Sequence, residues 1–500
     1  MSVSERFDAI VVGSGAGGGV IAGELADAGR GVLLLESGPH RTAVDYTRWE
    51  AHATHDLWWP PAFAEPPQSG LPPLIMFRGH CVGGTTAINT KVALRPTDQD
   101  YAKWHAAGGL VGPGGEPFGE RDLVDHIEHV ERRLGVRERT DWQQCVRTVQ
   151  PGFRALGADL EPVTAYTDAN CMRCGACLQG CPTNAGKNTL NTWIAPPWTQ
   201  GRLELRAGCR VGRVLIEDRG SGPEAVGVQY ADATGVPRHA DGDVVVVCAG
   251  ALASAQLLLR SGVREAAGGS PSTMLIGRHL GFHPAQLVEG LFDEIQDAHM
   301  VYPITSHCMK FQRDEDGGFV VEAATIQDPI GFATALCDER GVPLWGGELT
   351  EMMRRYRYFS GLLTMASDQN NGIAWVDDDD SDRYSYSFDE VERGRIDAAC
   401  GFAREVLLAA GAKRVLQTGV LSTHIQGGCR MGSDPERSVV DAHGESHDVR
   451  RLFVGDGSVV PCTLSVNPSL TIMSLAHRLA MYLASGEHGY FTAGALRAAA

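Results

Sequence analysis

The feature that most constrains the fold is a glycine-rich turn that joins an apolar run to a helical pattern near the N-terminus. Residues 7–12 (FDAIVV) are rich in β-branched and aromatic side chains, which predicts a short buried strand. The turn that follows contains Gly13, Gly15 and Gly18, and residues 19–29 (GVIAGELADAG) continue with a helical pattern. A strand, a glycine-rich turn and a helix in this order predict a dinucleotide-binding unit.

Each part of this unit has a physical task. Gly13 permits the tight turn, Gly15 lets a pyrophosphate approach the backbone, and Gly18 allows the helix to pack closely on the strand. The start of the helix offers free N–H groups and the positive end of its dipole to the phosphates. A second apolar run, residues 32–35, ends on Glu36, which is placed to hydrogen-bond the adenosine ribose. A tight turn without a ligand is the alternative, and the motif alone does not separate NAD from FAD.

Composition narrows the classes of protein that the chain can be. The 500 residues are 43% hydrophobic and 21% charged, as in a globular protein long enough for two or three domains. The formal net charge is −17 without a basic tract, which argues against nucleic-acid binding. The sequence lacks a run of about eighteen apolar residues, so no membrane span is expected. The 13 cysteines, mostly scattered singly, and an N-terminus without a signal-peptide pattern favour a cytoplasmic protein.

Four further segments carry recognisable patterns. They are residues 78–96 (RGHCVGGTTAINTKVALRP), 244–262 (VVVVCAGALASAQLLLRSG), 424–432 (HIQGGCRMG) and 451–478 (RLFVGDGSVVPCTLSVNPSLTIMSLAHR). Together with the N-terminal unit, and in this order, they resemble the glucose–methanol–choline (GMC) oxidoreductases. Within that family the chain is most similar to the bacterial FAD-dependent alcohol or sugar dehydrogenases that carry a four-cysteine run. The resemblance covers most of the chain and is loose only over about 290–415.

The resemblance implies an FAD enzyme that moves hydride from an alcohol or sugar CH–OH group to flavin N5. It assigns the ADP half of FAD to the N-terminal turn and Glu36, the pyrophosphate and isoalloxazine to residues 83–89, and the adenine to the strand at Val211. Some members attach FAD through a histidine where this chain has Ile88, so non-covalent FAD is expected. The implied FAD-binding residues are Gly13, Gly15, Gly18, Glu36, Gly83, Gly84, Asn89, Val211, Ala249, Asp456, Gly457, Asn467 and Thr471.

The resemblance also places a catalytic pair at His424 and Asn467. An imidazole can take a hydroxyl proton near neutral pH, and an amide N–H can hold the developing alkoxide. The dipeptide of Asn467 and Pro468 before an apolar periodic segment also predicts a helix start, with the asparagine as cap and the proline as first helical residue. The alternatives are that Asn467 only caps this helix and that His424 is an ordinary loop histidine.

A cysteine run marks residues 171–182 (CMRCGACLQGCP). Its spacing is the ferredoxin-type pattern, which predicts a [4Fe–4S] or [3Fe–4S] cluster. A zinc ion and unligated thiols, with or without a local disulfide, are the alternatives. A cluster would relay single electrons outward, which favours a dehydrogenase with a quinone or carrier protein as acceptor. The candidate ligands are Cys171, Cys174, Cys177 and Cys181. In two-cluster ferredoxins the fourth cysteine of such a run binds the other cluster, and this chain has only one run, so a role for Cys181 as a ligand is left open.

These motifs predict an α/β protein with a discontinuous Rossmann-like FAD-binding domain and an α+β substrate domain built on an antiparallel sheet. We assign residues 1–45, 75–100, 200–290 and 420–486 to the first domain. The substrate domain takes 290–419 together with 101–199, which carries the cysteine run, and 487–500 form a C-terminal tail. Three other functions remain open: an oxidase that uses oxygen, a cyanohydrin-type lyase on the same fold, and an electron-transfer flavoprotein.

Overall fold

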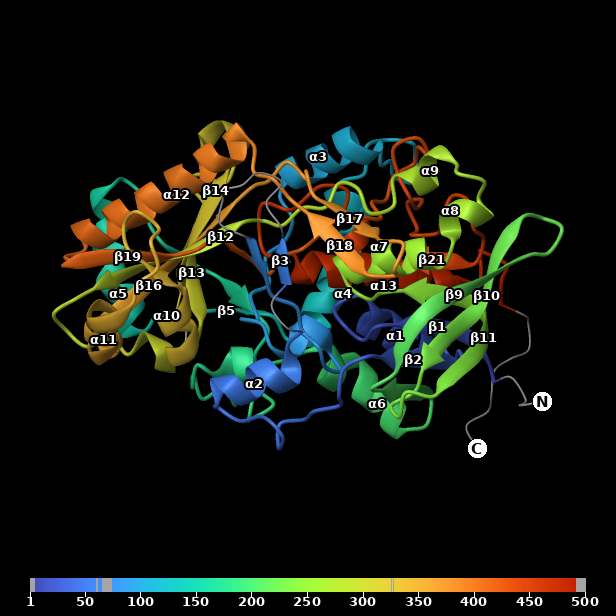
Figure 1. Cartoon of the computed structure of the whole chain (residues 1–500), viewed down its shortest axis with the longest axis horizontal. Coiled ribbons are helices and arrows are strands. Elements are labelled where there is room, and N and C mark those ends of the chain that lie inside the picture. Colours follow the sequence, from blue (N-terminus) through green and yellow to red (C-terminus); the bar gives the residue numbers. More distant parts are fainter. Residues whose placement is uncertain (1–4, 60–61, 65–73, 325, 327, 492–500) are drawn as a thin grey trace.

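The computed structural model describes residues 5–59, 62–64, 74–324, 326 and 328–491. These residues form two bodies, each organised around its own β-sheet (Figure 1). One sheet has seven strands and the other has ten. The prediction of an α/β chain with a Rossmann-like domain and a second domain on an antiparallel sheet is therefore confirmed.

The seven-stranded sheet has the order β8-β2-β1-β11-β10-β9, and β21 also pairs with β11. Strands β8, β2, β1, β11 and β21 run parallel, whereas β10 and β9 continue the sheet with antiparallel pairing. The bounds are β1 Arg6–Val12, β2 Val32–Glu36, β8 Leu203–Ala207, β9 Arg210–Asp218, β10 Pro223–Ala231, β11 Pro237–Val247 and β21 Leu452–Val454.

The central parallel strands β1 and β2 are mostly apolar, because they lie in the interior of this body. The last five residues of β1 and all of β2 are buried, as expected for strands without a solvent face. Helix α1 (Gly18–Asp27) packs against α13 (Ser469–Ser485), and α7 (Ala251–Arg260) packs against β9. The N-terminal strand, turn, helix and second strand thus lie where the sequence predicts them.

The register of the parallel strands brings their carboxyl ends to one edge of the sheet. Val12 of β1 pairs with Leu35 of β2 and with Val247 of β11, and Val247 pairs with Val454 of β21. Strands β1, β11 and β21 end at Val12, Val247 and Val454, and β2 ends one residue after Leu35, at Glu36. The glycine-rich turn, Glu36 and the turns after β11 and β21 therefore converge at this edge, which is where open α/β sheets bind ligands.

The ten-stranded sheet has the main order β3-β4-β20-β12-β16-β14-β13-β6, with β19 pairing to both β12 and β15. Its central pairs are antiparallel. The bounds are β3 Ala62–Ala64, β4 Leu74–Met76, β6 Glu161–Pro162, β12 Ala285–Leu291, β13 Ile304–Cys308, β14 Phe319–Ala324, β15 Leu336–Cys337, β16 Phe359–Ala366, β19 Arg414–Thr418 and β20 Leu421–Ser422.

The two faces of this sheet have different neighbours. Helices α5 (Gln144–Ala155) and α12 (Glu390–Ala409) cover one face, where Val288, Val321 and Leu362 pack into the same apolar cluster as residues of α12 (Figure 1). Side chains alternate along a strand, so the residues between these positions point to the opposite face. Glu289 and Glu322 lie on that opposite face.

The two bodies do not follow the predicted domain boundaries everywhere. The sequence predicts that residues 200–290 belong to the FAD-binding domain, but β12 within them pairs inside the ten-stranded sheet. It also predicts that 101–199 belong to the substrate domain, but Trp104, Ile127 and Trp193 are buried in the same apolar cluster as β1 and β2. Within the described residues, none of the helices combines the length and apolar character that crossing a bilayer requires. The other elements are α2 Glu50–Leu57, α3 Asp98–Gly108, α4 Val124–Leu134, α6 Ala195–Thr199, α8 Val263–Ala266, α9 Pro271–Met274, α10 Pro329–Ala335, α11 Gly346–Arg354, and the strand pairs β5 Arg137–Glu138 with β7 Thr164–Ala165 and β17 Ile373–Val376 with β18 Asp382–Ser385.

Candidate active site

The three N-terminal glycines of the motif occupy different environments. A Cβ atom on Gly13 would lie 2.3 Å from the carbonyl oxygen of Cys248, and its φ of +97° also favours glycine. A Cβ on Gly18 would lie 1.9 Å from the carbonyl oxygen of Gly13. A Cβ on Gly15 would meet no atom within 4 Å. Gly13 and Gly18 are thus required by packing, whereas Gly15 borders open space, as a phosphate-binding position needs.

Glu36 ends β2 and is tied to the glycine-rich turn. One carboxylate oxygen accepts hydrogen bonds from the backbone N–H and the hydroxyl of Ser14, at 3.0 and 2.7 Å. The other accepts from the backbone N–H of Gly38 at 2.7 Å. The Ser14 hydroxyl in turn accepts from the N–H of Gly83 at 2.9 Å. Ser14, which the motif analysis did not single out, therefore joins Glu36 to the second glycine segment.

The second glycine segment faces the first. Gly83 and Gly84 have φ values of +95° and +51°, and a Cβ on Gly84 would lie 2.8 Å from the Cα of Gly15. Farther along, the amide of Asn89 donates to the hydroxyl of Tyr166 at 2.6 Å. That hydroxyl lies 3.1 Å from the Ser469 hydroxyl at the start of α13. Residues 83–89 thus run from the glycine-rich turn to the helix that follows Asn467.

The turns after β11 and β21 meet through Asp456. Its carboxylate accepts from the backbone N–H of Gly250 at 2.7 Å, the hydroxyl of Ser254 at 2.5 Å and its neighbour Ser458 N–H at 2.8 Å. Ala249, between the strand and α7, is exposed although the strand before it is buried. Asp456 thus joins the two turns, and this edge of the sheet remains open. Of the other predicted residues, Gly457 follows Asp456 directly, Val211 lies on β9, and Thr471 lies in the first turn of α13.

Several buried polar atoms in the predicted cofactor segments have no hydrogen-bond partner within the described residues. They are the Ser458 and Thr471 hydroxyls and the side-chain carbonyl oxygen of Asn467. Buried polar groups normally find a partner, so such a set indicates a missing ligand. Together with the open space at Gly15, these atoms fit a bound dinucleotide whose far end reaches α13.

His424 follows β20 and lies against a second histidine that the sequence analysis did not identify. The Nδ1 atoms of His424 and His283 are 3.2 Å apart, and the ring centroids are 5.2 Å apart. Burial lowers the pKa of His424 to about 4, although its side chain is partly exposed. The imidazole of His424 is therefore neutral at physiological pH and can accept a proton.

Asn467 does not act as the predicted helix cap. Helix α13 begins at Ser469 with Pro468 in the cap position, and no side chain caps it. The prediction that Pro468 is the first helical residue and Asn467 the cap is thus wrong by one residue. The Asn467 amide instead faces the carboxyl of Glu322. Burial is the larger influence on that carboxyl and raises its pKa to about 8, whereas the contact with Asn467 lowers it in part. Asn467 is 5% exposed, and its amide faces the ten-stranded sheet rather than capping its own helix.

Glu322 belongs to a group of buried polar side chains on the face of the ten-stranded sheet opposite α12. His307 pairs directly with Glu322 across β13 and β14, and Glu289 lies on β12. Both carboxyl groups are fully buried, and none of their oxygens makes a hydrogen bond of normal geometry with a described residue. A charged residue in the middle of an apolar strand (GFVVEAATI, AQLVEGLF) was the signal that could have identified them.

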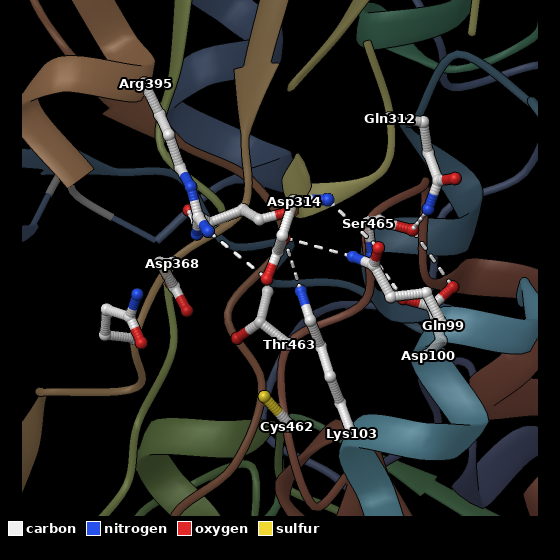
Figure 2. Close-up of polar contacts among 12 residues, drawn as sticks. Gln99, Asp100, Lys103, Gln312, Asp314, Asp368, Arg395, Cys462, Thr463 and Ser465 are labelled. Carbon is white, nitrogen blue, oxygen red and sulfur yellow. Dashed lines mark hydrogen bonds and ion pairs between the residues drawn. The ribbon is translucent and has the colours of Figure 1, made fainter. Parts of the chain in front are cut away.

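The loop before Asn467 is fixed by a polar network (Figure 2). The backbone N–H of Ser465 donates to Asp100 of α3 at 2.8 Å. Beside it, Lys103 of the same helix pairs with Asp314 at 2.9 Å, and Arg395 of α12 pairs with the other oxygen of Asp314 at 3.2 Å. The network therefore connects the active-site loop to helices on both sides, which stabilises the position of Asn467.

The four cysteines of the run surround one hollow. They line a small hollow that is partly open to solvent, together with Tyr302 and Thr167. Cys171, Cys174, Cys177 and Cys181 are all unpaired in the structure, so no local disulfide forms among them. The loop that carries them folds back on residues 89–91 and thereby lies beside the predicted flavin segment.

The fold and this edge of the sheet define the class of the protein, which is that of the two-domain FAD-dependent oxidoreductases. Residues 7–285 match the N-terminal domain of the GMC oxidoreductases, and residues 356–476 match the C-terminal domain. The chain belongs to the GMC oxidoreductase family. It is accordingly an FAD-dependent oxidoreductase that acts on CH–OH donors.

Individual relatives differ in what their names say they oxidise. A long-chain-alcohol oxidase of Arabidopsis thaliana is 27% identical over 94% of this chain, which spans only 66% of that relative's length. The 6'''-hydroxyparomomycin C oxidase of Streptomyces lividus is 28% identical, with 96% of this chain and 91% of the relative covered. Pyridoxine 4-oxidase from Mesorbium loti shares the fold, with a TM-score of 0.71 and 19% identity over 95% of this chain and 98% of its own.

Proposed function

We propose that the chain oxidises the CH–OH group of a small alcohol or sugar, with His424 as the base and Asn467 as the hydrogen-bond donor to the substrate oxygen. Two observations support this proposal: His424 has a neutral, partly exposed imidazole, and the buried amide of Asn467 has a carbonyl oxygen without a partner among the described residues. The two groups come from loops that precede and follow β21, at the edge where the cofactor segments converge.

His424 has one nitrogen for each of two tasks. Its Nδ1 is engaged with His283 at 3.2 Å, so Nε2 is the nitrogen available to a substrate hydroxyl. The contact with His283 also fixes the ring orientation, as a second residue does for catalytic histidines in general. A neutral imidazole in this position can take the hydroxyl proton while the C–H bond breaks.

Asn467 would hold the substrate oxygen while negative charge develops on it. An amide supplies a directed N–H donor for this purpose. The neighbouring Glu322 carboxyl is fully buried and therefore favours its neutral form. The contact with Asn467 lowers the pKa of Glu322, so an amide N–H of Asn467 is the donor and the Glu322 carboxyl the acceptor. This contact would orient the amide and leave its second N–H for the substrate.

FAD supplies the hydride acceptor when it is bound. We propose Gly15, Gly84 and Glu36 for its ADP half and pyrophosphate, with Thr471 and Ser458 near the other end. The open side of Gly15 and the unpartnered hydroxyls support this placement. Ile88 precedes Asn89 where a covalent histidine would stand, which supports non-covalent binding.

Anaerobic mixing with candidate alcohols tests this function. Bleaching of the flavin by an alcohol, retained in a His443→Asn control and lost in His424→Ala at equal flavin content, is the expected result. Flavin that stays oxidised while a cyanohydrin is cleaved would instead identify a lyase. Equal bleaching in the wild-type enzyme and in His424→Ala would contradict the assigned base.

We infer in addition that the four-cysteine loop holds an iron–sulfur cluster. In a tetrahedral zinc site the sulfur atoms lie about 3.8 Å apart, because each Zn–S bond is about 2.3 Å long. Within the described residues, which include all four cysteines, three sulfur atoms do not come within 4.8 Å of one another. A cluster places its own iron and sulfide atoms between the thiolates and so tolerates a wider spacing than a single zinc ion.

Lys91 supports the same inference. Its side chain is fully buried and donates to the carbonyl of Thr86, and a buried ammonium group requires a nearby anion. The ionisable groups that act on it are the thiols of Cys177, Cys181 and Cys81, and none is a carboxylate. Thiolates bound to a cluster would supply the missing negative charge. The N–H of Gly186, 3.2 Å from the sulfur of Cys181, is a donor of the kind that stabilises such thiolates.

A cluster in this place favours a dehydrogenase over an oxidase. Lys91 and Asn89 lie on one segment, and Asn89 reaches Tyr166 and the start of α13, so the cluster would lie beside the flavin. Electrons could then pass singly to a quinone or carrier protein. Anaerobic purification with iron and sulfide analysis tests this, and Cys177→Ser should lose both. A protein without iron that reduces oxygen rapidly would identify an oxidase instead.

A further inference from the structure

Three helices on the seven-stranded-sheet side of the molecule bring together three histidines and a glutamate outside the active site. Helix α4 contributes His126 and His129, α13 contributes His477, and α1 contributes Glu24. Helix α13 packs against both α1 and α4, so all three meet here (Figure 1). Neither the flavin chemistry nor the cysteine loop uses these residues.

The ligand atoms of this cluster converge on a small volume. Nε2 of His129 lies 3.0 Å from a carboxylate oxygen of Glu24. The rings of His129 and His477 are stacked with centroids 3.9 Å apart, and one ligand atom each from Glu24, His129 and His477 lie within 4.8 Å of one another. Two ligands on one zinc ion are about 3.3 Å apart, so small side-chain rotations would close the set.

Glu24 and His477 each also have a ligand atom without a partner among the described residues. The Nδ1 of His477 is engaged with Nδ1 of His126 at 2.8 Å, which leaves its Nε2 available. One oxygen of Glu24 accepts from His129, from Arg133 and from Trp193, whereas no such bond to its other oxygen occurs within the described residues. Histidines that bind metals are commonly held by a second group through their other nitrogen, which is the place of His126.

We propose that Glu24, His129 and His477 bind a divalent transition-metal ion of the zinc class, with His126 orienting His477. Two imidazoles and one carboxylate are a ligand set that zinc accepts, with water completing the tetrahedron. The ion would join α1, whose first turn borders the proposed phosphate site, to α13, which follows Asn467. It would therefore stabilise the cofactor-binding half of the molecule.

Arg133 competes with the ion for Glu24. Its guanidinium donates to Glu24 at 2.8 Å and also to Asp27 at 3.0 Å. A cation at the site would face this positive charge, but Asp27 offers Arg133 a second partner. Removal of the guanidinium by Arg133→Gln should accordingly tighten metal binding, whereas a cluster that merely packs the helices together would give no such gain.

Zinc binding to the chelator-treated, flavin-loaded full chain tests the proposal, by calorimetry and by metal analysis after dialysis. We expect a zinc equivalent that is lost in His129→Asn and in His477→Asn but retained in His52→Asn, an exposed histidine on α2, and in Cys177→Ser. Zinc should also raise the melting temperature of wild type but not of His129→Asn. His129 is partly exposed, so this variant should fold.

Two results would overturn the proposal. One is the same zinc stoichiometry in wild type, His129→Asn and His477→Asn, with only Cys177→Ser lowering it. The other is weaker or unchanged zinc binding in Arg133→Gln. Neither result bears on flavin reduction by an alcohol, so the metal site and the proposed function are tested separately.

Discussion

The Nδ1 atoms of His283 and His424 lie 3.2 Å apart although the two residues are 141 positions apart in the chain. Only one of the two nitrogens can carry the hydrogen, so the contact couples the tautomers of the two rings. His283 is fully buried, with a φ of +45°, and its own backbone N–H donates to Asp368 at 2.9 Å. The partner of the proposed base is thus fixed by its surroundings.

The pH dependence of catalysis follows from this environment. Burial lowers the pKa of His424 to about 4. Above that pH the imidazole is neutral and can act as a base, and as the pH falls through 4 it becomes protonated and loses this ability. We expect kcat/KM for an alcohol to be level from about pH 6 to neutral and to fall only towards pH 4. A fall centred at or above the ordinary histidine pKa of about 6.5 would contradict the assignment.

Replacing the proposed base should separate chemistry from binding. His424→Ala should lower kcat by about 100- to 10,000-fold with the flavin retained. His283→Gln should lower kcat less, because the base is still present but its ring is no longer fixed. Steady-state kinetics at matched flavin content give the comparison, and a His283→Gln effect equal to that of His424→Ala would instead make both residues essential to proton transfer.

The contact of Glu322 with Asn467 predicts a difference between two substitutions of the same glutamate. Glu322→Gln keeps an oxygen that can accept from the Asn467 amide, whereas Glu322→Leu leaves the buried amide without this partner. Asn467→Ala should lower kcat by about 100-fold, as loss of an oxyanion donor does. Glu322→Leu should approach that loss, and Glu322→Gln should stay near wild type. Equal kcat in the two glutamate variants would show that Glu322 does not position Asn467.

Two glycines of one motif should lose different properties when a methyl group is added: Gly15 its contribution to FAD binding, and Gly18 its contribution to the stability of the fold. Gly15→Ala places its Cβ in open space, so the apoprotein should keep its melting temperature but bind FAD more weakly. Gly18→Ala places its Cβ 1.9 Å from the carbonyl oxygen of Gly13 and should destabilise the fold itself. Thermal melting of both apoproteins and flavin titration provide the measurements. Unchanged FAD affinity in Gly15→Ala would show that no phosphate of FAD lies against Gly15.

Glu289 predicts how stability changes with pH. Burial raises its pKa from 4.5 to about 8, so the folded state keeps a proton that the unfolded state releases between these values. Its contribution is complete below about pH 4.5 and is lost as the pH rises through 8. Relative to wild type, Glu289→Gln should therefore gain free energy of unfolding from pH 5 to pH 8, by a few kcal/mol in order of magnitude. The exposed control Glu405→Gln should show no such trend. If the free energies of unfolding of wild type and Glu289→Gln changed in parallel between pH 5 and pH 8, the raised pKa of Glu289 would be contradicted.

The parts of the fold that the sequence predicts are those encoded within short segments. The strand, turn and helix at Gly13, Gly15 and Gly18 need only neighbouring residues, because strand pattern and turn glycines act locally. His283 and Glu322 were not identified because their partners lie far away in sequence and meet them only after the two sheets pack. The helix start at Asn467 was misplaced by one residue for the same reason, since its amide faces the ten-stranded sheet rather than capping the helix.

The measurement that tests the central claim most directly is the anaerobic reduction rate of the bound flavin by an alcohol deuterated at its carbinol carbon. If hydride leaves that carbon while His424 takes the hydroxyl proton, deuterium should slow the bleaching of wild-type flavin, and His424→Ala should bleach slowly while retaining its flavin. Bleaching that is insensitive to deuterium and equally fast in His424→Ala would contradict the account.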